Sequence, residues 1–292
     1  MKNNEGHRRN ARPKETGRAA RRPKEKDWQD RRLKESGRPA ERPDDSENEL
    51  LVGRNAVTEA LRAGRGINRV LLVPGDRKSA EIEDLARAQG VPVEHVKRER
   101  IEAMASGMRH QGVLAYAAPV PYATLEDILH RAEEQGEPPF LVLLDELEDP
   151  HNLGALLRTA DATGAHGILI PKRRAVPLNA TVAKTSAGAV EYVPVARIGN
   201  IAQTLKALKE KGFWVAGADM DGAQNYWEAD LTGPLVLVVG SEGHGMSRLT
   251  KENCDFIVKM PMVGRINSLN ASVAGSILMY ESMRQRLLKK KA

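Results

Sequence analysis

The chain has 292 residues, of which 41% are hydrophobic and 29% charged, so it can bury the cores of two ordinary domains. A single cysteine, Cys254, excludes an internal disulfide, and no histidine stands at a zinc-ligand spacing, so no metal is expected. No apolar run is long enough for a membrane span or a signal peptide, and the sequence therefore predicts a cytoplasmic protein.

The formal net charge of +6 indicates an anionic partner, and it is unevenly distributed. Residues 1–40 contain 14 Lys and Arg against 6 Asp and Glu, which accounts for all of the excess. This segment repeats a polar pattern, KETGR then ARRP and KESGR then AERP, with too little apolar surface to fold. We expect residues 1–47 to be a disordered basic arm, either a solubilising tail or, as its arginine content favours, a segment that binds RNA phosphates.

Residues 48–119 have the pattern of a small α/β domain. Strands are expected at residues 70–73, 93–96 and 113–117, and helices around residues 57–61, 82–86 and 98–105. Two prolines, Pro119 and Pro121, mark its end, and residues 120–138 read as a linker that contains a polar helix at 125–134.

Residues 139–292 predict a second domain, a parallel α/β sheet with crossover helices. Its first strand, FLVLL at 140–144, is apolar throughout, as in strands buried on both faces of a sheet. Further strands are expected at 167–170, 193–195, 213–218, 235–240 and 256–258, and helices at 153–163, 201–211, 247–252 and 270–288. Ligands of such sheets bind at the carboxyl ends of the strands, so the loops there are the candidate site.

The first candidate loop follows the strand at 140–144 and contains Asn152, with Arg158 six residues later. Asn152 could cap the next helix. Arg158 stands among Ala, Leu and Thr residues, where its charge needs either solvent or a partner.

The second candidate loop, GSEGHG at 240–245, has glycines that let a ligand approach the backbone closely. The glycine spacing is not that of a dinucleotide fingerprint. Glu242 would repel a phosphate but suits a cation, such as Arg158 or a sulfonium.

The third candidate loop, at 260–272, contains Met260, Ser268, Leu269 and Asn270. Either Ser268 or Asn270 could cap the long helix that follows. The small residues after them, VAGS at 273–276, would let another part of the chain pack closely against this helix.

Together these loops resemble the SpoU class of RNA ribose 2′-O-methyltransferases, part of the SPOUT superfamily. The segments NLGALLRTADATGAHGILI, LVLVVGSEGHGMSRL and MPMVGRINSLNASVA are similar to the three motifs of that class, in order. Residues 50–117, with GRNAVTEAL and RHQGVLAY, resemble the small substrate-binding domain of many members. This arrangement is similar to the RlmB type, which methylates a guanosine in the peptidyl-transferase region of 23S rRNA.

The resemblance implies a carboxyl-terminal domain with a deep trefoil knot, which forms a pocket for S-adenosylmethionine, and a homodimer in which the last helix packs. It implies that three residues line the cofactor pocket: Gly240, Met260 and Leu269. It implies that five residues form the polar catalytic centre: Asn152, Arg158, Glu242, Ser268 and Asn270.

The implied chemistry is an in-line displacement from a sulfonium, which requires no metal and mainly the orientation of donor and acceptor. The ribose hydroxyl must lose its proton during the attack. The arginine of the class is often proposed as the base, yet a guanidinium is almost always protonated. Arg158 could therefore equally hold a phosphate or the developing alkoxide, with Glu242 paired to it.

Two alternatives stay open. The same chemistry could act on a tRNA or on another rRNA nucleotide. A protein of this fold could also be a non-catalytic RNA-binding or ribosome-assembly factor, although such a factor would not need the cofactor loops. The absent glycine fingerprint speaks against a nucleotide-dependent oxidoreductase.

Overall fold

The computed structural model describes residues 48–75, 77–265 and 268–290. The predicted basic arm, residues 1–47, lies outside the described residues. Among the described helices, none has the length and apolar character needed to cross a bilayer.

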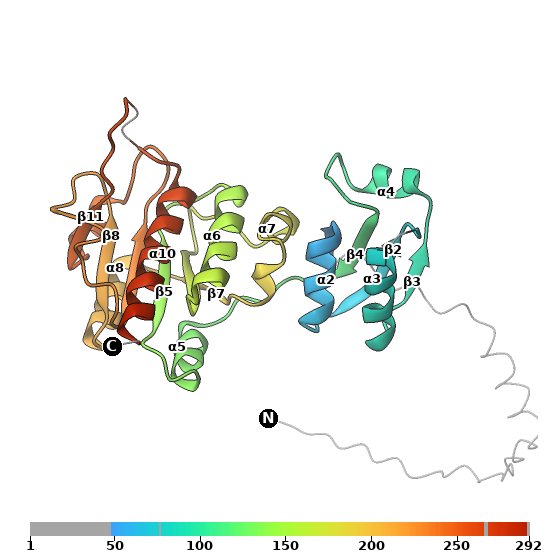
Figure 1. The fold of residues 1–292 in the computed structure, drawn as a ribbon, viewed down its shortest axis with the longest axis horizontal. Coiled ribbons are helices and arrows are strands. Elements are labelled where there is room, and N and C mark those ends of the chain that lie inside the picture. Colours follow the sequence, from blue (N-terminus) through green and yellow to red (C-terminus); the bar gives the residue numbers. More distant parts are fainter. Residues whose placement is uncertain (1–47, 76, 266–267, 291–292) are drawn as a thin grey trace, which may run out of the picture. The chain divides into compact units, whose positions relative to one another are not determined.

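Residues 49–117 form a four-stranded sheet with strand order β1-β4-β2-β3 (Figure 1). Its strands are β1 (Glu49–Val52), β2 (Ile67–Leu72), β3 (Val93–His95) and β4 (Val113–Ala117). The helices that connect them are α2 (Arg54–Arg62), α3 (Arg77–Ala88) and α4 (Arg98–Met104). β4 runs antiparallel to β1 and β2, whereas β2 and β3 are parallel. The predicted small α/β domain is therefore present, with β1 as a strand that the sequence pattern did not predict.

The polar helix predicted at 125–134 is present as α5 (Leu125–Glu134), and its start is fixed by a capping box between Thr124 and Asp127. The helix is amphipathic: Ile128 is fully buried in a core that also contains strand residues of the second sheet. A Cβ on Gly167 would come within 2.6 Å of the Ile128 side chain, so this glycine lets α5 pack directly on the sheet. The segment is thus a packed element of the domain that follows it.

The second sheet has seven strands in the order β7-β6-β5-β10-β8-β11-β9, and each strand is parallel to its neighbours. The strands are β5 (Phe140–Leu144), β6 (Gly167–Pro171), β7 (Val195–Ile198), β8 (Trp214–Ala218), β9 (Gln224–Asn225), β10 (Leu235–Val239) and β11 (Phe256–Lys259). The helices are α6 (Pro150–Thr163), α7 (Ala180–Thr185), the 3-10 turn η2 (Ala189–Glu191), α8 (Ile201–Glu210), α9 (Arg248–Glu252) and α10 (Ala271–Lys289). The prediction of a parallel α/β sheet with crossover helices is confirmed. The trefoil knot that the resemblance implies stays a prediction.

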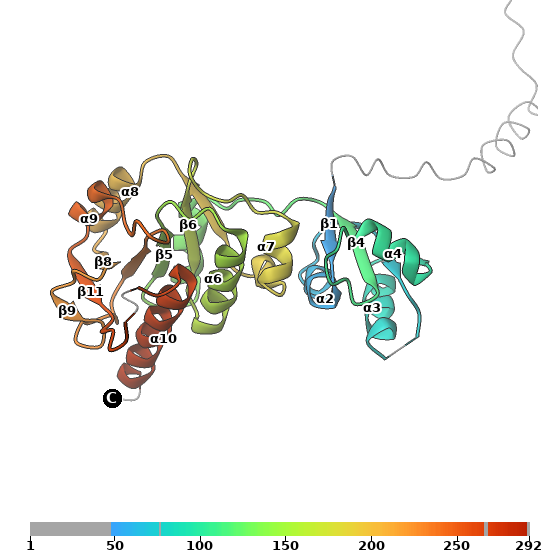
Figure 2. The ribbon, with the colours of Figure 1, turned by 90° about the horizontal axis from the view of Figure 1, so that it is seen from above.

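Helices cover both faces of this sheet, and the interior strand β5 shows why (Figure 2). Successive side chains of a strand point to opposite faces. Phe140, Val142 and Leu144 of β5 pack in the cluster that includes residues of α6 and α10. Leu141 and Leu143 pack in the cluster that includes residues of α5 and α8. All five are at most 1% exposed, so an unbroken apolar run is what this position requires.

The helices α6 and α10 lie side by side on one face of the sheet (Figures 1 and 2). A Cβ on Gly275 of α10 would come within 2.6 Å of the Leu156 side chain of α6. The hydroxyls of Thr159 and Ser276 are 2.8 Å apart across the same contact. The expectation that the small residues at 273–276 permit close packing is therefore confirmed.

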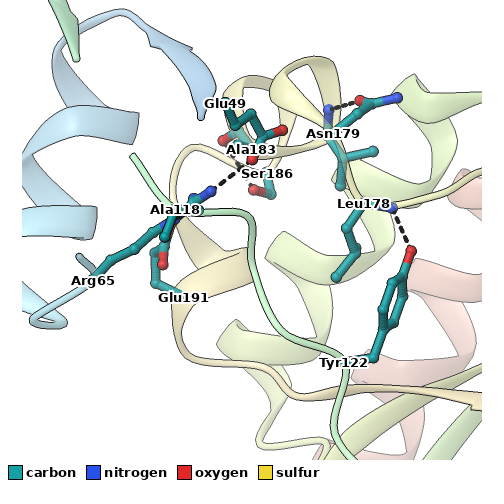
Figure 3. A network of polar contacts seen from close by, with 10 residues as sticks. Glu49, Arg65, Ala118, Tyr122, Leu178, Asn179, Ala183, Ser186 and Glu191 are labelled. Carbon is teal, nitrogen blue, oxygen red and sulfur yellow. Dashed lines mark hydrogen bonds and ion pairs between the residues drawn. The ribbon is translucent and has the colours of Figure 1, made fainter. Parts of the chain in front are cut away.

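A buried cluster of charges joins β1 to η2 (Figure 3). The guanidinium of Arg65 donates to Glu49 at 2.6 Å and to Glu191 at 2.8 Å, and its side chain is only 5% exposed. Arg65 also donates to the carbonyl of Ala118 at 2.6 Å. Burial raises the pKa of Glu191, and the adjacent Arg65 opposes that rise. The cluster therefore depends on Arg65, which contacts both carboxylates, to compensate their charge.

Candidate active site

The first two candidate loops leave neighbouring strands at the same edge of the sheet. Leu144 of β5 stands opposite Val239 of β10, and the backbone amide of Asp145 donates to the Val239 carbonyl at 2.9 Å. The side chain of Asp145, 1% exposed, accepts from the backbone amide of Ser247 at 2.8 Å. Asp145, which the sequence reasoning did not single out, thus ties the two loops together.

Three of the predicted polar residues meet in one hydrogen-bonded cluster. The amide of Asn152 donates to Oε1 of Glu242 at 3.0 Å. The amide of Asn270 donates to the same oxygen and, at 3.0 Å, to the carbonyl oxygen of Asn152. Each residue comes from a different candidate loop, so the cluster joins all three.

The helix that Asn270 caps determines how its side chain is oriented. Its carbonyl oxygen accepts from the backbone amides of Ser272 at 3.0 Å and Val273 at 3.2 Å, which makes it the N-cap of α10. Because that oxygen is occupied by donors, the amide nitrogen must face the acceptors on Glu242 and Asn152. Of the two residues that could cap this helix, Asn270 is the one that does so.

Asn152 does not cap α6. The cap is Asp149, whose carboxylate accepts from the amide of His151 at 2.9 Å, and Pro150 begins the helix. Asn152 lies in the first turn and is 5% exposed. Its side chain is therefore free of capping and available to the cluster.

A cavity of about 600 Å³ lies beside this cluster, within the range of small-molecule sites. Among the residues that line it are four of the predicted site residues in addition to Glu242: Gly240, Met260, Ser268 and Leu269. The second and third candidate loops therefore share one cleft, and the first loop reaches its wall through the hydrogen bond of Asn152 to Glu242.

The glycines of the second loop are required by the turn itself. A Cβ on Gly240 would come within 2.2 to 2.5 Å of backbone atoms of Gly245 and Met246. Ser241 and Gly245 exchange two backbone hydrogen bonds of 3.0 Å, and Gly245 has a φ of +65°. Substitution at either glycine would open this turn, which forms part of the cavity wall.

The loop after β8 also lines the cavity, and the sequence analysis did not predict this. Asp219, Met220 and Asp221 of this loop line the cavity together with Lys251. The ammonium of Lys251 lies 3.1 Å from Asp219 and 3.4 Å from Asp221. Burial lowers the pKa of Lys251, but the hydrogen bonds and charges of the two aspartates outweigh it, and the pKa is raised. The signal was present in the sequence, since Asp219 directly follows an apolar strand.

Arg158 is the one predicted site residue found neither in the hydrogen-bonded cluster nor in the lining of the cavity. It is exposed on α6, and the six residues that separate it from Asn152 turn it about 240° around the helix and about 9 Å along it. The expected pairing of Arg158 with Glu242 is not present among the described residues, and Oε1 of Glu242 accepts from the two asparagines.

Two family models match the chain. One, the SpoU rRNA methylase family, covers residues 139–280, and the other, RNA 2′-O ribose methyltransferase substrate binding, covers residues 50–123. A Bacillus subtilis protein described as a putative TrmH family tRNA/rRNA methyltransferase, YacO, is 49% identical over 82% of this chain and 97% of its own length. A Staphylococcus haemolyticus protein of the same description is 48% identical over 82% of this chain and 97% of that protein.

Solved structures show the same architecture. An S-adenosylmethionine-bound rRNA methyltransferase from Sinorhizobium meliloti aligns with a TM-score of 0.67 at 26% identity, over 82% of this chain and 88% of that chain. The SpoU methyltransferase AviRb from Streptomyces viridochromogenes aligns with a TM-score of 0.71 at 24% identity, over 85% of this chain and 93% of that chain, a likeness of fold alone.

Proposed function

We propose that this chain, which belongs to the SpoU rRNA methylase family, transfers a methyl group from S-adenosylmethionine to a ribose 2′-oxygen of RNA. The observation that carries the proposal is the cluster of Asn152, Glu242 and Asn270 beside the 600 Å³ cavity. A binding protein without catalytic activity would have no need to orient a carboxylate at the edge of such a cavity.

The lining of the cavity suits this cofactor. Met260, Leu269 and Ala271 offer an apolar wall for a purine, and the carboxylate of Glu242 on the same wall suits a sulfonium cation. When bound, the cofactor supplies an activated methyl group with its own leaving group.

The residues of the chain orient the nucleophile. The two asparagine amides engage Oε1 of Glu242 and fix the carboxylate plane. Among the described residues Oε2 has no hydrogen-bond partner. In the proposal it accepts a hydrogen bond from the ribose 2′-hydroxyl and would take its proton as the O–CH3 bond forms and the S–CH3 bond breaks. Ser268, which lines the same cavity, serves as a further hydroxyl near the substrate.

We propose that Arg158 enters the site from a second copy of the chain. On α10, Val273, Tyr280 and Leu287 are 46%, 49% and 50% exposed and recur every seven residues. An exposed apolar stripe at this spacing is typical of a helix that packs against a partner helix. Because α6 lies beside α10, a dimer through this stripe would bring Arg158 of one protomer to the other. There the guanidinium would hold a phosphate or the developing alkoxide.

A complementation assay tests this arrangement. Arg158→Ala and Glu242→Gln proteins, each inactive alone, should regain methyl transfer when mixed and refolded together, because one site per mixed dimer then has both native residues. If the mixture remains inactive although mixed dimers form, Arg158 does not act across the dimer.

The proposed substrate is a guanosine in the peptidyl-transferase region of 23S rRNA, which would place the protein in the cytoplasm. The small domain, matched to a substrate-binding model, supports an RNA substrate of this kind. A tRNA is the second candidate substrate, because the relatives are described as tRNA/rRNA methyltransferases.

Transfer of labelled methyl groups to purified rRNA and tRNA separates these substrates, and calorimetry with S-adenosylmethionine separates the enzyme from a binding factor. We expect cofactor binding and label in rRNA. Label in tRNA alone would show that the substrate is a tRNA. Absence of both cofactor binding and methyl transfer would indicate an RNA-binding or ribosome-assembly factor instead of an enzyme.

A further inference from the structure

A group of unpaired cations lies at the carboxyl ends of β6 and β7. Lys172 and Arg173 directly follow β6, and Arg197 belongs to β7. All three side chains are exposed, and among the described residues none lies within ion-pair distance of a carboxylate. The next cation along the chain, Arg174, differs in that it pairs with Glu146 at 2.6 Å.

The guanidinium of Arg197 is held in place without a carboxylate. It stacks over the ring of Tyr122 at 5.0 Å and donates to the backbone carbonyl of Lys172 at 3.2 Å. The hydroxyl of Tyr122 in turn accepts from the backbone amide of Leu178 at 2.8 Å (Figure 3). An exposed arginine ordinarily has many rotamers, whereas this one has its orientation fixed before any anion binds.

The three residues are neighbours in the backbone of two adjacent strands. Ile170 of β6 is in register with Arg197 of β7, and Lys172 and Arg173 follow Pro171 at the end of the same strand. Like charges gathered in this way repel one another, and an anionic ligand relieves the repulsion. Planar guanidinium groups and lysine ammonium groups together are suited to phosphate oxygens.

This cluster lies on the same edge of the sheet as the candidate active site. β5, β6 and β7 are neighbouring parallel strands, so their carboxyl ends align, and α6 with Asn152 begins after β5. At about 4.8 Å per strand, β7 is about 10 Å from β5. That separation is within the reach of the nucleotides that flank a ribose bound at Asn152.

We propose that Lys172, Arg173 and Arg197 bind the phosphates of the RNA strand that flanks the methylated ribose. This inference rests on the proposed function and adds a substrate-binding surface on the sheet domain, separate from the small domain. Phosphate binding of this kind adds affinity without sequence preference and is weakened by salt.

The test is the salt dependence of RNA binding, measured with a fluorescein-labelled single-stranded oligouridylate. Each phosphate contact adds about 0.7 to the slope of log affinity against log salt, so Lys172→Ala with Arg173→Ala should reduce the slope by about 1.4. Both side chains are exposed and have no ion pair within the described part of the chain, so the fold should not change. Arg197→Lys, which keeps the charge but loses the planar group stacked on Tyr122, should weaken binding at low salt with a smaller change in slope.

The matched control is Lys206→Ala with Lys211→Ala, which removes two exposed charges at α8. Its slope should equal that of the unaltered protein. Equal slopes for the Lys172/Arg173 variant and this control would overturn the proposal, even if the unaltered protein methylates RNA. A reduced slope only in the Lys172/Arg173 variant would support the phosphate site, even if no methyl transfer were found.

Discussion

Asn270 has two functions in one side chain, and only one of them could be predicted from the sequence. The capping of the long helix follows from residue type and position. The contact of its amide with Glu242 depends on the approach of a loop 28 residues away. The motifs therefore pointed to residues that the fold brings together, whereas the hydrogen bonds between them could not be predicted.

Replacement of Asn270 by Asp should separate the two functions. Asp retains the capping oxygen, so thermal stability should change little, but it removes the amide donor and sets a second carboxylate beside Glu242. The loss of one positioned donor corresponds to about a hundredfold or greater fall in kcat for methyl transfer. The comparison variant is Asn270→Ser, which also caps the helix but adds no charge. Unchanged kcat in both variants would remove Asn270 from the site.

His166 should make stability depend on pH. Its side chain is 1% exposed, and its Nδ1 accepts from the backbone amide of Phe140 at 3.0 Å. Burial lowers the pKa of His166, with the charge of Glu137 opposing the shift. The unfolded chain therefore binds a proton more readily than the folded one. Stability conferred by the neutral ring should be complete above pH 6.5 and fall as the pH drops from there towards the folded pKa.

Urea unfolding on both sides of pH 6.5 measures this dependence. His166→Asn, whose Oδ1 takes the place of Nδ1 and can still accept from the amide of Phe140, should show a flatter profile than the unaltered protein. An identical slope with pH in the two proteins would assign the dependence to other groups.

At the scale of elements, strands with an unbroken apolar run were predicted, whereas several short segments were not. The strands β5 and β10 were found as expected because they are apolar throughout. β1 and α7 were missed, since four and six residues carry too little periodicity. The strand expected at 193–195 is β7, which spans Val195–Ile198. The prediction ended too early because the exposed Arg197 interrupts the apolar pattern on which it was based.

The packing of α7 on α6 depends on Gly154. A Cβ there would come within 1.9 Å of Oγ1 and 2.6 Å of Cβ of Thr185, and within 2.9 Å of the amide of Ser186. Gly154→Ala should therefore destabilise the fold by about 1 to 3 kcal/mol, although alanine favours helices. Gly199→Ala, at a site with no atoms within 4 Å of the added Cβ, is the control and should be nearly neutral. Equal unfolding free energies for the two variants would contradict this packing.

At the scale of the whole molecule, Arg65 links β1 to η2 through Glu49 and Glu191. Arg65→Met would leave both carboxylates buried without their cation, at a cost of about 3 to 5 kcal/mol. The cost should shrink as the pH falls, because burial already raises the pKa of Glu191 and protonation removes its charge. Chemical unfolding at neutral and acidic pH measures both effects.

The control for this prediction is Arg87→Met. Arg87 pairs with Glu83 at 3.2 Å, but its side chain is 71% exposed, so its loss should change stability by less than about 1 kcal/mol. A triple variant with Arg65→Met, Glu49→Gln and Glu191→Gln should recover part of the stability. A cost for Arg65→Met no larger than that for Arg87→Met would contradict a buried, interdependent cluster.

The central claim is that the loops after β5 and β10 and before α10 bring a methyl donor to a ribose hydroxyl. The most direct measurement is nucleotide-level mapping of the methyl group transferred from S-adenosylmethionine to rRNA fragments. The account predicts a single ribose methylated on its 2′-oxygen, with the modification lost in Glu242→Gln. Methylation of a base, or undiminished ribose methylation in Glu242→Gln, would contradict it.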